Sequence, residues 1–155
     1  MTDMVGTVTL KVQRILTQHL GYKFQMQGDV MLLAFEDAST VVTVRCVPFG
    51  SKDERLPQVL VHIECPLLID VKPTPELLEW VARNATKRWF GAVSLGDGPG
   101  DDTVHLSLMH TLVGDTIDPM ELALPLLLML KSADELDDEL QARFGGKRMA
   151  DVRKA

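Results

Sequence analysis

The stretch Asp118–Leu130, "DPMELALPLLLML", decides how this chain folds, because it joins a strong helix start to an almost unbroken apolar run. Asp118 suits the helix-capping position, Pro119 suits the first helical position, and Glu121 completes a capping box. From Leu122 to Leu130 every residue is apolar or proline. Such a run in a chain of net charge −6 must be buried, either by the domain itself or by a partner.

The helix is predicted to continue to Phe144, where the pair Gly145-Gly146 ends it. Its 27 residues, counted from Asp118, correspond to about 40 Å, which exceeds the ~30 Å width of a small domain. Part of the helix is therefore expected to project, bend or meet another chain. Pro125 cannot donate a hydrogen bond to the carbonyl of Glu121, so a kink is expected there.

Two apolar sets run along this helix. The first steps by three or four residues over its whole length and is expected to pack on a sheet: Leu122, Leu126, Met129, Ala133, Leu136, Leu140 and Phe144. The second covers the other side and stops at Lys131: Met120, Leu124, Leu127 and Leu128. We favour burial of the second set within the monomer, because a helix that is apolar all round is usually central. In the alternative, a second copy or a bound peptide covers these four residues, which are then the partner-binding site.

The rest of the sequence predicts an α+β domain built on a mainly antiparallel sheet. Apolar spacing predicts a first helix over Met4–Leu20, capped by Thr2 or Asp3 and ended by Gly21. β-Branched or alternating apolar residues predict four strands before a second helix and two after it: 22–27, 30–35, 40–49, 58–65, 89–95 and 103–110. The second helix is expected to begin at Thr74-Pro75-Glu76, with these residues on its apolar side: Leu78, Val81, Ala82, Ala85 and Trp89.

Length and charge limit the classes of function that the chain can have. At 155 residues, with 46% hydrophobic and 25% charged residues, the chain is expected to form a single domain over residues 1–146. An acidic balance, with pI near 5.1, argues against a nucleic-acid or anionic-membrane partner. One basic cluster lies in the segment 147–155, which we expect to be a solvated tail: Lys147, Arg148, Arg153 and Lys154. No secretory signal is visible and the apolar run is too short for a membrane crossing, so a cytoplasmic protein is predicted.

No residue pattern predicts a catalytic, cofactor or metal site. His62 and Cys65 are three residues apart on a strand and so face opposite sides of the sheet. His62 and His105 could meet if their strands are neighbours, which leaves a ligand or metal site on that face as an alternative. Cys46 and Cys65 are expected to be buried, reduced and unpaired, since a hairpin through residues 49–57 would place Cys46 opposite a residue near Leu60.

The last third of the chain resembles the second half of YbjN-like and type III secretion chaperone-like domains. A hairpin, a glycine turn, an Asp-Pro helix start, an Ala-Asp pair and a closing Gly-Gly carry the resemblance: Gly114, Asp118, Leu122, Ala133, Asp134, Leu140, Gly145 and Gly146. The first half is similar in its order of elements. The chain departs from the pattern at Pro125 and in having four strands before the second helix where secretion chaperones have three.

The resemblance implies a non-enzymatic module that binds peptides or partner proteins without a cofactor, commonly as a homodimer. An exposed sheet edge could add an extended peptide through backbone hydrogen bonds, while apolar helix surface takes its side chains. Two other functions stay open at this point. One is a small-ligand-binding protein or enzyme that uses the His62 and His105 face, and the other is a structural subunit of a larger complex.

Overall fold

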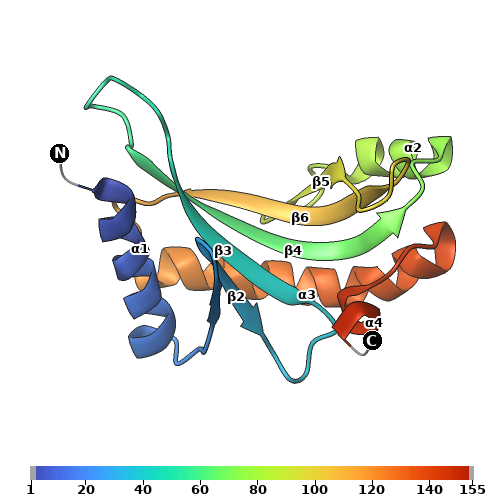
Figure 1. Ribbon diagram of the computed structural model, residues 1–155, viewed down its shortest axis with the longest axis horizontal. Helices are drawn as coiled ribbons and strands as arrows, with labels where there is room; N and C mark the ends of the chain where they lie inside the picture. The colour runs from blue at the N-terminus through green and yellow to red at the C-terminus, as the bar shows by residue number, and fades with distance from the viewer. Residues whose placement is uncertain (1–2, 154–155) are drawn as a thin grey trace.

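A computed structural model describes residues 3–153, which form one six-stranded sheet with helices packed on it (Figure 1). The strands follow one another across the sheet in the order β1-β2-β3-β4-β6-β5, and every neighbouring pair is antiparallel. Their bounds are Gln25–Gln27 (β1), Val30–Ala34 (β2), Val41–Pro48 (β3), Val59–Val71 (β4), Ala92–Asp97 (β5) and Val104–Val113 (β6). The predicted α+β class and the division into four strands and two strands are confirmed.

The helices also follow the predicted order. They are α1 (Met4–Arg14), its π-helical continuation η1 (Ile15–His19), α2 (Pro75–Asn84), α3 (Pro119–Phe144) and a short α4 (Met149–Arg153). Asp3 caps α1 by accepting a hydrogen bond from the Gly6 amide at 2.9 Å, while the other expected cap, Thr2, lies outside the described residues. Gly21 ends the helical segment with φ of +69°, a conformation that glycine adopts without strain.

Helix α3 begins and ends where the sequence predicts. Asp118 and Glu121 form both hydrogen bonds of the capping box, and Gly145 is the C-cap with φ of +76°. The helix continues through Pro125 without interruption (Figure 1). Its sheet-facing set is buried at five of seven positions, and Leu136 and Phe144 are half-buried against the same core.

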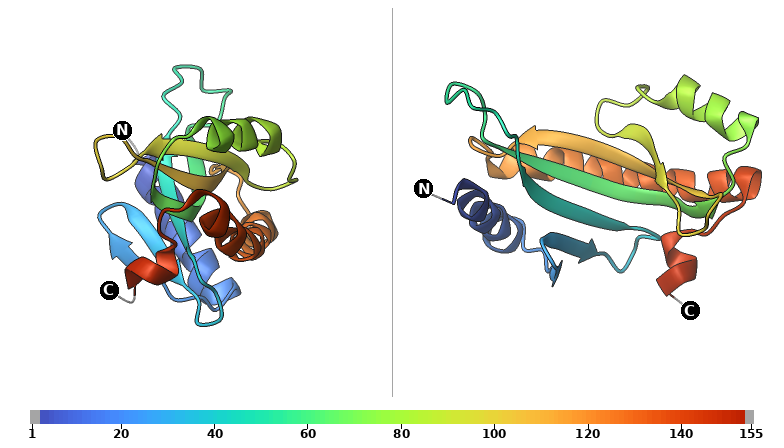
Figure 2. Two further views of the ribbon diagram at one scale, coloured as in Figure 1. Left: turned by 90° about the vertical axis from the view of Figure 1, so that its right-hand side faces the viewer. Right: turned by 45° about the horizontal axis from the view of Figure 1, so that its top comes forward.

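One face of the sheet carries the hydrophobic core. Along β4, Val59, Val61, Ile63 and Cys65 are fully buried, and the residues between them are half-buried, as alternation predicts. Figures 1 and 2 show α3 running along one side of the sheet and α1 lying at the end that holds the N-terminus. The two helices thus cover the packed face. The start of α3 lies beside the end of β6.

The apolar side predicted for α2 is confirmed at Val81, which is half-buried against the core, and is wrong at Leu78, Ala82 and Trp89. The helix buries Leu77 and Trp80, whereas Leu78 is 45% exposed and Trp89 is 96% exposed. The helix ends at Asn84, so Trp89 lies in the following loop and cannot belong to a helical face. The Trp80 ring meets Phe144 of α3 edge to face, with ring centroids 6.2 Å apart, and this contact sets the rotation of α2.

The basic C-terminal segment folds back onto the domain. Backbone groups of Lys147 and Ile69 exchange two hydrogen bonds of 2.7 Å, which attaches the segment to β4. Arg148 forms ion pairs with Asp138 of α3 and with Asp151. The expectation of a solvated tail is therefore wrong for Arg148 and for the backbone of Lys147, whose side chain stays 61% exposed, and Lys154 lies outside the described residues. Within residues 3–153, no helix combines the length and apolarity that a bilayer crossing requires.

Candidate functional site

The second apolar set of α3 lies on the surface. Met120 is 68% exposed, Leu124 44%, Leu127 43% and Leu128 42%. The favoured expectation, burial of this set within the monomer, is therefore wrong. We call these four residues the α3 stripe. Leu124 follows Met120 by four positions, and Leu127 and Leu128 follow Leu124 by three and four, so the set forms one continuous band on the side of the helix that faces away from the sheet.

A groove borders the stripe where α3 starts beside β6. It has a volume of about 550 Å³, and we call it the α3–β6 groove. Its apolar lining comes from the loop before β5, the end of β6 and the first two turns of α3: Phe90, Leu112, Val113, Met120, Leu124 and Pro125. Thr111, Thr116 and Glu121 complete the wall, so Glu121 is the one charged residue among those lining it. The groove can take an apolar side chain with little polar desolvation.

A tight turn holds the start of α3 against the sheet. The Gly114 amide donates to the Val59 carbonyl at 2.8 Å, and the Asp115 carboxylate accepts hydrogen bonds from the amides of Gln58 and Val59. Desolvation acts to raise the pKa of Asp115, but these backbone hydrogen bonds outweigh it and leave the pKa below its ordinary value. Ile117, in the same turn, is 1% exposed. The groove therefore has a firmly positioned wall.

A second pocket of about 560 Å³ adjoins the groove. We call it the Arg88 pocket, and it is lined by the loop after α2 and by β5 and β6: Thr86, Arg88, Trp89, Gly91, Ala92, Val93, Ser94, Met109, His110 and Thr111. Thr111 lines both cavities, and Phe90 of the groove packs edge to face on His110 of the pocket at 5.4 Å. Burial lowers the pKa of His110, which keeps its ring neutral at pH 7.

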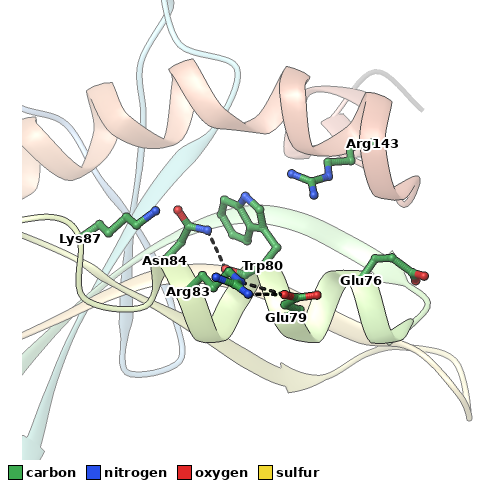
Figure 3. A pocket seen from close by; sticks show the side chains of 7 residues that line it. All are labelled: Glu76, Glu79, Trp80, Arg83, Asn84, Lys87 and Arg143. Carbon is green, nitrogen blue, oxygen red and sulfur yellow. Dashed lines mark hydrogen bonds and ion pairs between the residues drawn. The ribbon is translucent and has the colours of Figure 1, made fainter.

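A third cavity, between α2 and the end of α3, is polar. Figure 3 shows Arg143 of α3 opposite Glu76, Glu79, Arg83 and Lys87 of the α2 region. Arg83 and Glu79 pair within α2 at 2.7 Å. Its lining mixes charges of both signs around Trp80. The cavity offers no apolar wall comparable to that of the α3–β6 groove.

Comparison with known families assigns the chain. The family described as "T3SS (YopN, CesT) and YbjN peptide-binding chaperone 1" matches residues 7–152. The chain belongs to this family. The resemblance seen in the last third of the sequence is thereby confirmed and extends over nearly the whole chain. No protein of curated function matches the sequence.

Two solved structures share the fold of this family member. YbjN from E. coli superposes with a TM-score of 0.60 at 12% identity, over 86% of this chain and 92% of YbjN. The Yersinia pestis type III secretion chaperone SycH, solved with a stable fragment of YscM2, gives a TM-score of 0.52 at 15% identity, over 83% of this chain and 98% of SycH. At such identities the likeness concerns the fold alone.

The two histidines of the alternative site do not meet. Strands β4 and β6 are neighbours, but His62 lies opposite Thr111, six residues from His105 along β6, which is about 20 Å. His105 instead lies 3.7 Å from Glu64 and 2.9 Å from the carbonyl of Asp97. No group of three His, Cys, Asp or Glu side chains within residues 3–153 is placed to hold a metal ion.

Both cysteines are buried and free. Cys46 lies opposite Val61 of β4, and Cys65 lies opposite Leu108 of β6, so the thiols are not neighbours. Burial raises the pKa of Cys46, and burial together with Glu64 raises that of Cys65 to about 12. Neither thiol forms a thiolate at neutral pH, which agrees with the structural role predicted for them.

Sequence reasoning found the α3 stripe but missed its neighbours in space. The missed neighbours are Phe90, Val113 and Arg88. The sequence predicts only ordinary strands or loops for the segments that contain them. The available signal was the cluster "KRWF" at residues 87–90, where two large aromatic residues follow two cations in the loop after a helix. That cluster indicates a binding surface only once the structure places β6 and α3 beside it.

Proposed function

We propose that this protein is a non-enzymatic, chaperone-like module that binds an apolar segment of a client protein in the α3–β6 groove and along the α3 stripe. It acts as a homodimer in the cytoplasm. One observation carries the proposal: four large apolar side chains of one helix are between 42% and 68% exposed beside an apolar groove. A contiguous exposed apolar patch usually marks an interaction site.

The energetics of such binding are favourable. Burial of a fully exposed leucine side chain contributes about 1.5–3 kcal/mol, so each leucine of the stripe, 42–44% exposed, contributes a little under half of that. Several such anchors together, with the apolar side chains of the peptide, offset the ordering of a flexible peptide. Because the groove wall is fixed by the Asp115 turn, little of this free energy is lost in reorganising the protein. Helix-in-groove or extended-peptide recognition would both use the same anchors.

The test replaces Leu124 and Leu127 together by aspartate. Both are exposed, so the variant is expected to fold, as circular dichroism would report. Retention of random dodecapeptides displayed on phage is expected to fall at least tenfold, because each charge is placed where an apolar anchor binds. Light scattering on the same samples shows whether the dimer depends on the same residues.

Leu78 supplies the matched control. It is 45% exposed on α2, almost the same as Leu124, but it lies outside the groove. Leu78→Asp is expected to leave peptide retention and mass unchanged. A wild-type protein that is monomeric and enriches no peptide would refute the proposal, and recovery of one partner at fixed stoichiometry would favour a structural subunit instead.

A further inference from the structure

Arg88 has a buried hydrogen-bond donor without an acceptor. Its Nη1 atom is buried and has no hydrogen-bond partner among the described residues, and the one other side-chain atom in that condition is Oδ1 of Asp137. A buried N–H of a charged group without an acceptor is costly, because the group has lost water and gained nothing in exchange. Nε and Nη2 of the same guanidinium are not among these buried unpaired atoms and take part in no ion pair within residues 3–153, so an acceptor from outside the chain would approach this edge.

Four arginines of the domain form ion pairs, and Arg143 lies over the ring of Phe144. Arg45 pairs with Asp29, Arg55 with Asp53, Arg83 with Glu79 and Arg148 with Asp138 and Asp151. Although the chain holds 22 acidic residues, none lines the Arg88 pocket. His110 is neutral at pH 7 because burial lowers its pKa, so Arg88 is the one charged group among the pocket-lining residues. The pocket is therefore complementary to a negative charge.

The position of this charge beside the α3–β6 groove ties it to peptide recognition. Thr111 lines both cavities, and the Phe90–His110 ring contact lies between them. An extended peptide advances about 7 Å for every two residues, so an apolar residue in the groove and a residue at Arg88 can belong to one short segment. The exposed Trp89 adds apolar surface beside the pocket.

We infer that the client segment is an extended acidic-apolar peptide, in which an Asp or Glu lying within a few residues of the apolar anchor pairs with Arg88. A guanidinium binds a carboxylate through two parallel N–H···O bonds, which gives this contact geometric specificity as well as strength. Arg88 then determines which apolar segments are accepted. The inference rests on the proposed function and names the class of peptide that the groove takes.

The experiment begins with dodecapeptides selected on the wild-type protein from a random phage library. Asp or Glu is expected to be enriched near the apolar consensus residues. One selected peptide is then synthesised together with its analogue carrying Gln for Glu or Asn for Asp, and both are titrated by fluorescence anisotropy. The wild type is expected to bind the neutral analogue about tenfold more weakly, whereas Arg88→Gln is expected to bind both peptides equally.

Lys87 provides the matched control. It is the neighbouring cation, it lines the α2–α3 cavity and not the Arg88 pocket, and Lys87→Gln changes net charge by the same amount. This variant is expected to keep the tenfold ratio between the two peptides. Arg88→Lys keeps the charge without the two-pronged geometry, and an intermediate ratio is expected.

The outcomes separate this inference from the proposed function. Peptides that are enriched without acidic residues, or a tenfold ratio that survives in Arg88→Gln, would overturn the inference and leave the groove in place. A loss of dimer in Arg88→Gln with unchanged peptide ratios would overturn it too, since Arg88 would then contact a second copy. Failure of the wild type to enrich any peptide would refute both the proposed function and the role of Arg88.

Discussion

Asp137 is a carboxyl group inside the domain, where α3 meets the loop between β2 and β3. It is 1% exposed, its Oδ2 lies 2.5 Å from the Ser39 hydroxyl, and that hydroxyl lies 2.7 Å from Asp134. A hydroxyl has a single proton, so Ser39 can donate it fully to only one of these two carboxyl groups at a time. Burial raises the pKa of Asp137, against a lowering by the Ser39 hydrogen bond, so Asp137 keeps its proton to a higher pH than an ordinary aspartate.

The pH dependence of stability is expected to reveal this raised pKa. Because the folded pKa of Asp137 is raised, its contribution is fully present below the ordinary value near 3.9 and is lost as pH rises through the folded pKa. Asp137→Asn stays neutral at every pH. Urea titrations are therefore expected to show wild type losing stability relative to Asp137→Asn with rising pH, by at most about 1.4 kcal/mol per pH unit.

Acidic groups with lowered pKa, such as Asp115 and Asp151, act in the opposite direction but are common to both proteins and cancel in the difference. Asp101→Asn, at the exposed tip of the β5–β6 hairpin, is the control and is expected to show no such trend. A difference between wild type and Asp137→Asn that stays constant with pH would mean that Asp137 is ionised in the fold.

At the scale of elements, the two ends of α3 are determined by residues close to them in sequence. Its start is set by Asp118, Pro119 and Glu121, and its end by Gly145, all of which act within one turn of the helix terminus. Such signals can be read from sequence because they need no distant partner. The face that α2 buries could not be read in this way, because Leu77 and Leu78 are both apolar and the contact between Trp80 and Phe144 decides between them.

Removal of the α3 cap is expected to weaken the domain measurably. Asp118→Ala loses the hydrogen bond from the Glu121 amide at 2.8 Å, and thermal or urea unfolding is expected to show a loss of about 0.5–2 kcal/mol. Asp118→Asn keeps an acceptor in the same place and is expected to fall within a few tenths of a kcal/mol of wild type. Equal losses in both variants would show that the capping geometry is not what stabilises this end.

At the scale of the whole molecule, the C-terminal segment closes the domain by crossing to β4. Gly146 has φ of +78°, and a Cβ built there would lie 3.0 Å from the Ile69 carbonyl oxygen and 3.0 Å from the Val71 Cβ. Gly145 also has positive φ, +76°, but a Cβ there meets nothing within 4 Å. The two neighbouring glycines therefore separate backbone strain from steric contact.

Alanine at each glycine tests this closure. Gly145→Ala is expected to cost about 1–3 kcal/mol from the backbone alone, because φ of +76° with ψ of −151° is a region nearly confined to glycine. Gly146→Ala is expected to cost about 1–3 kcal/mol more, because the new methyl group pushes the segment from β4. Urea unfolding measures both free energies, and equal costs would mean that the segment shifts freely and does not contribute to the fold.

The sequence by itself determined the order of elements, the limits of α3, the packed face of β4 and the inert state of both cysteines. Capping, periodicity and strand alternation are local, so each leaves its mark in a few consecutive residues. Only the tertiary structure decided that the α3 stripe is exposed, since a helix that is apolar all round reads the same whether or not something covers it. The Arg88 pocket and the α3–β6 groove likewise arise where the loop after α2, the end of β6 and the start of α3 meet, and contacts between segments so far apart in the chain leave no local signal.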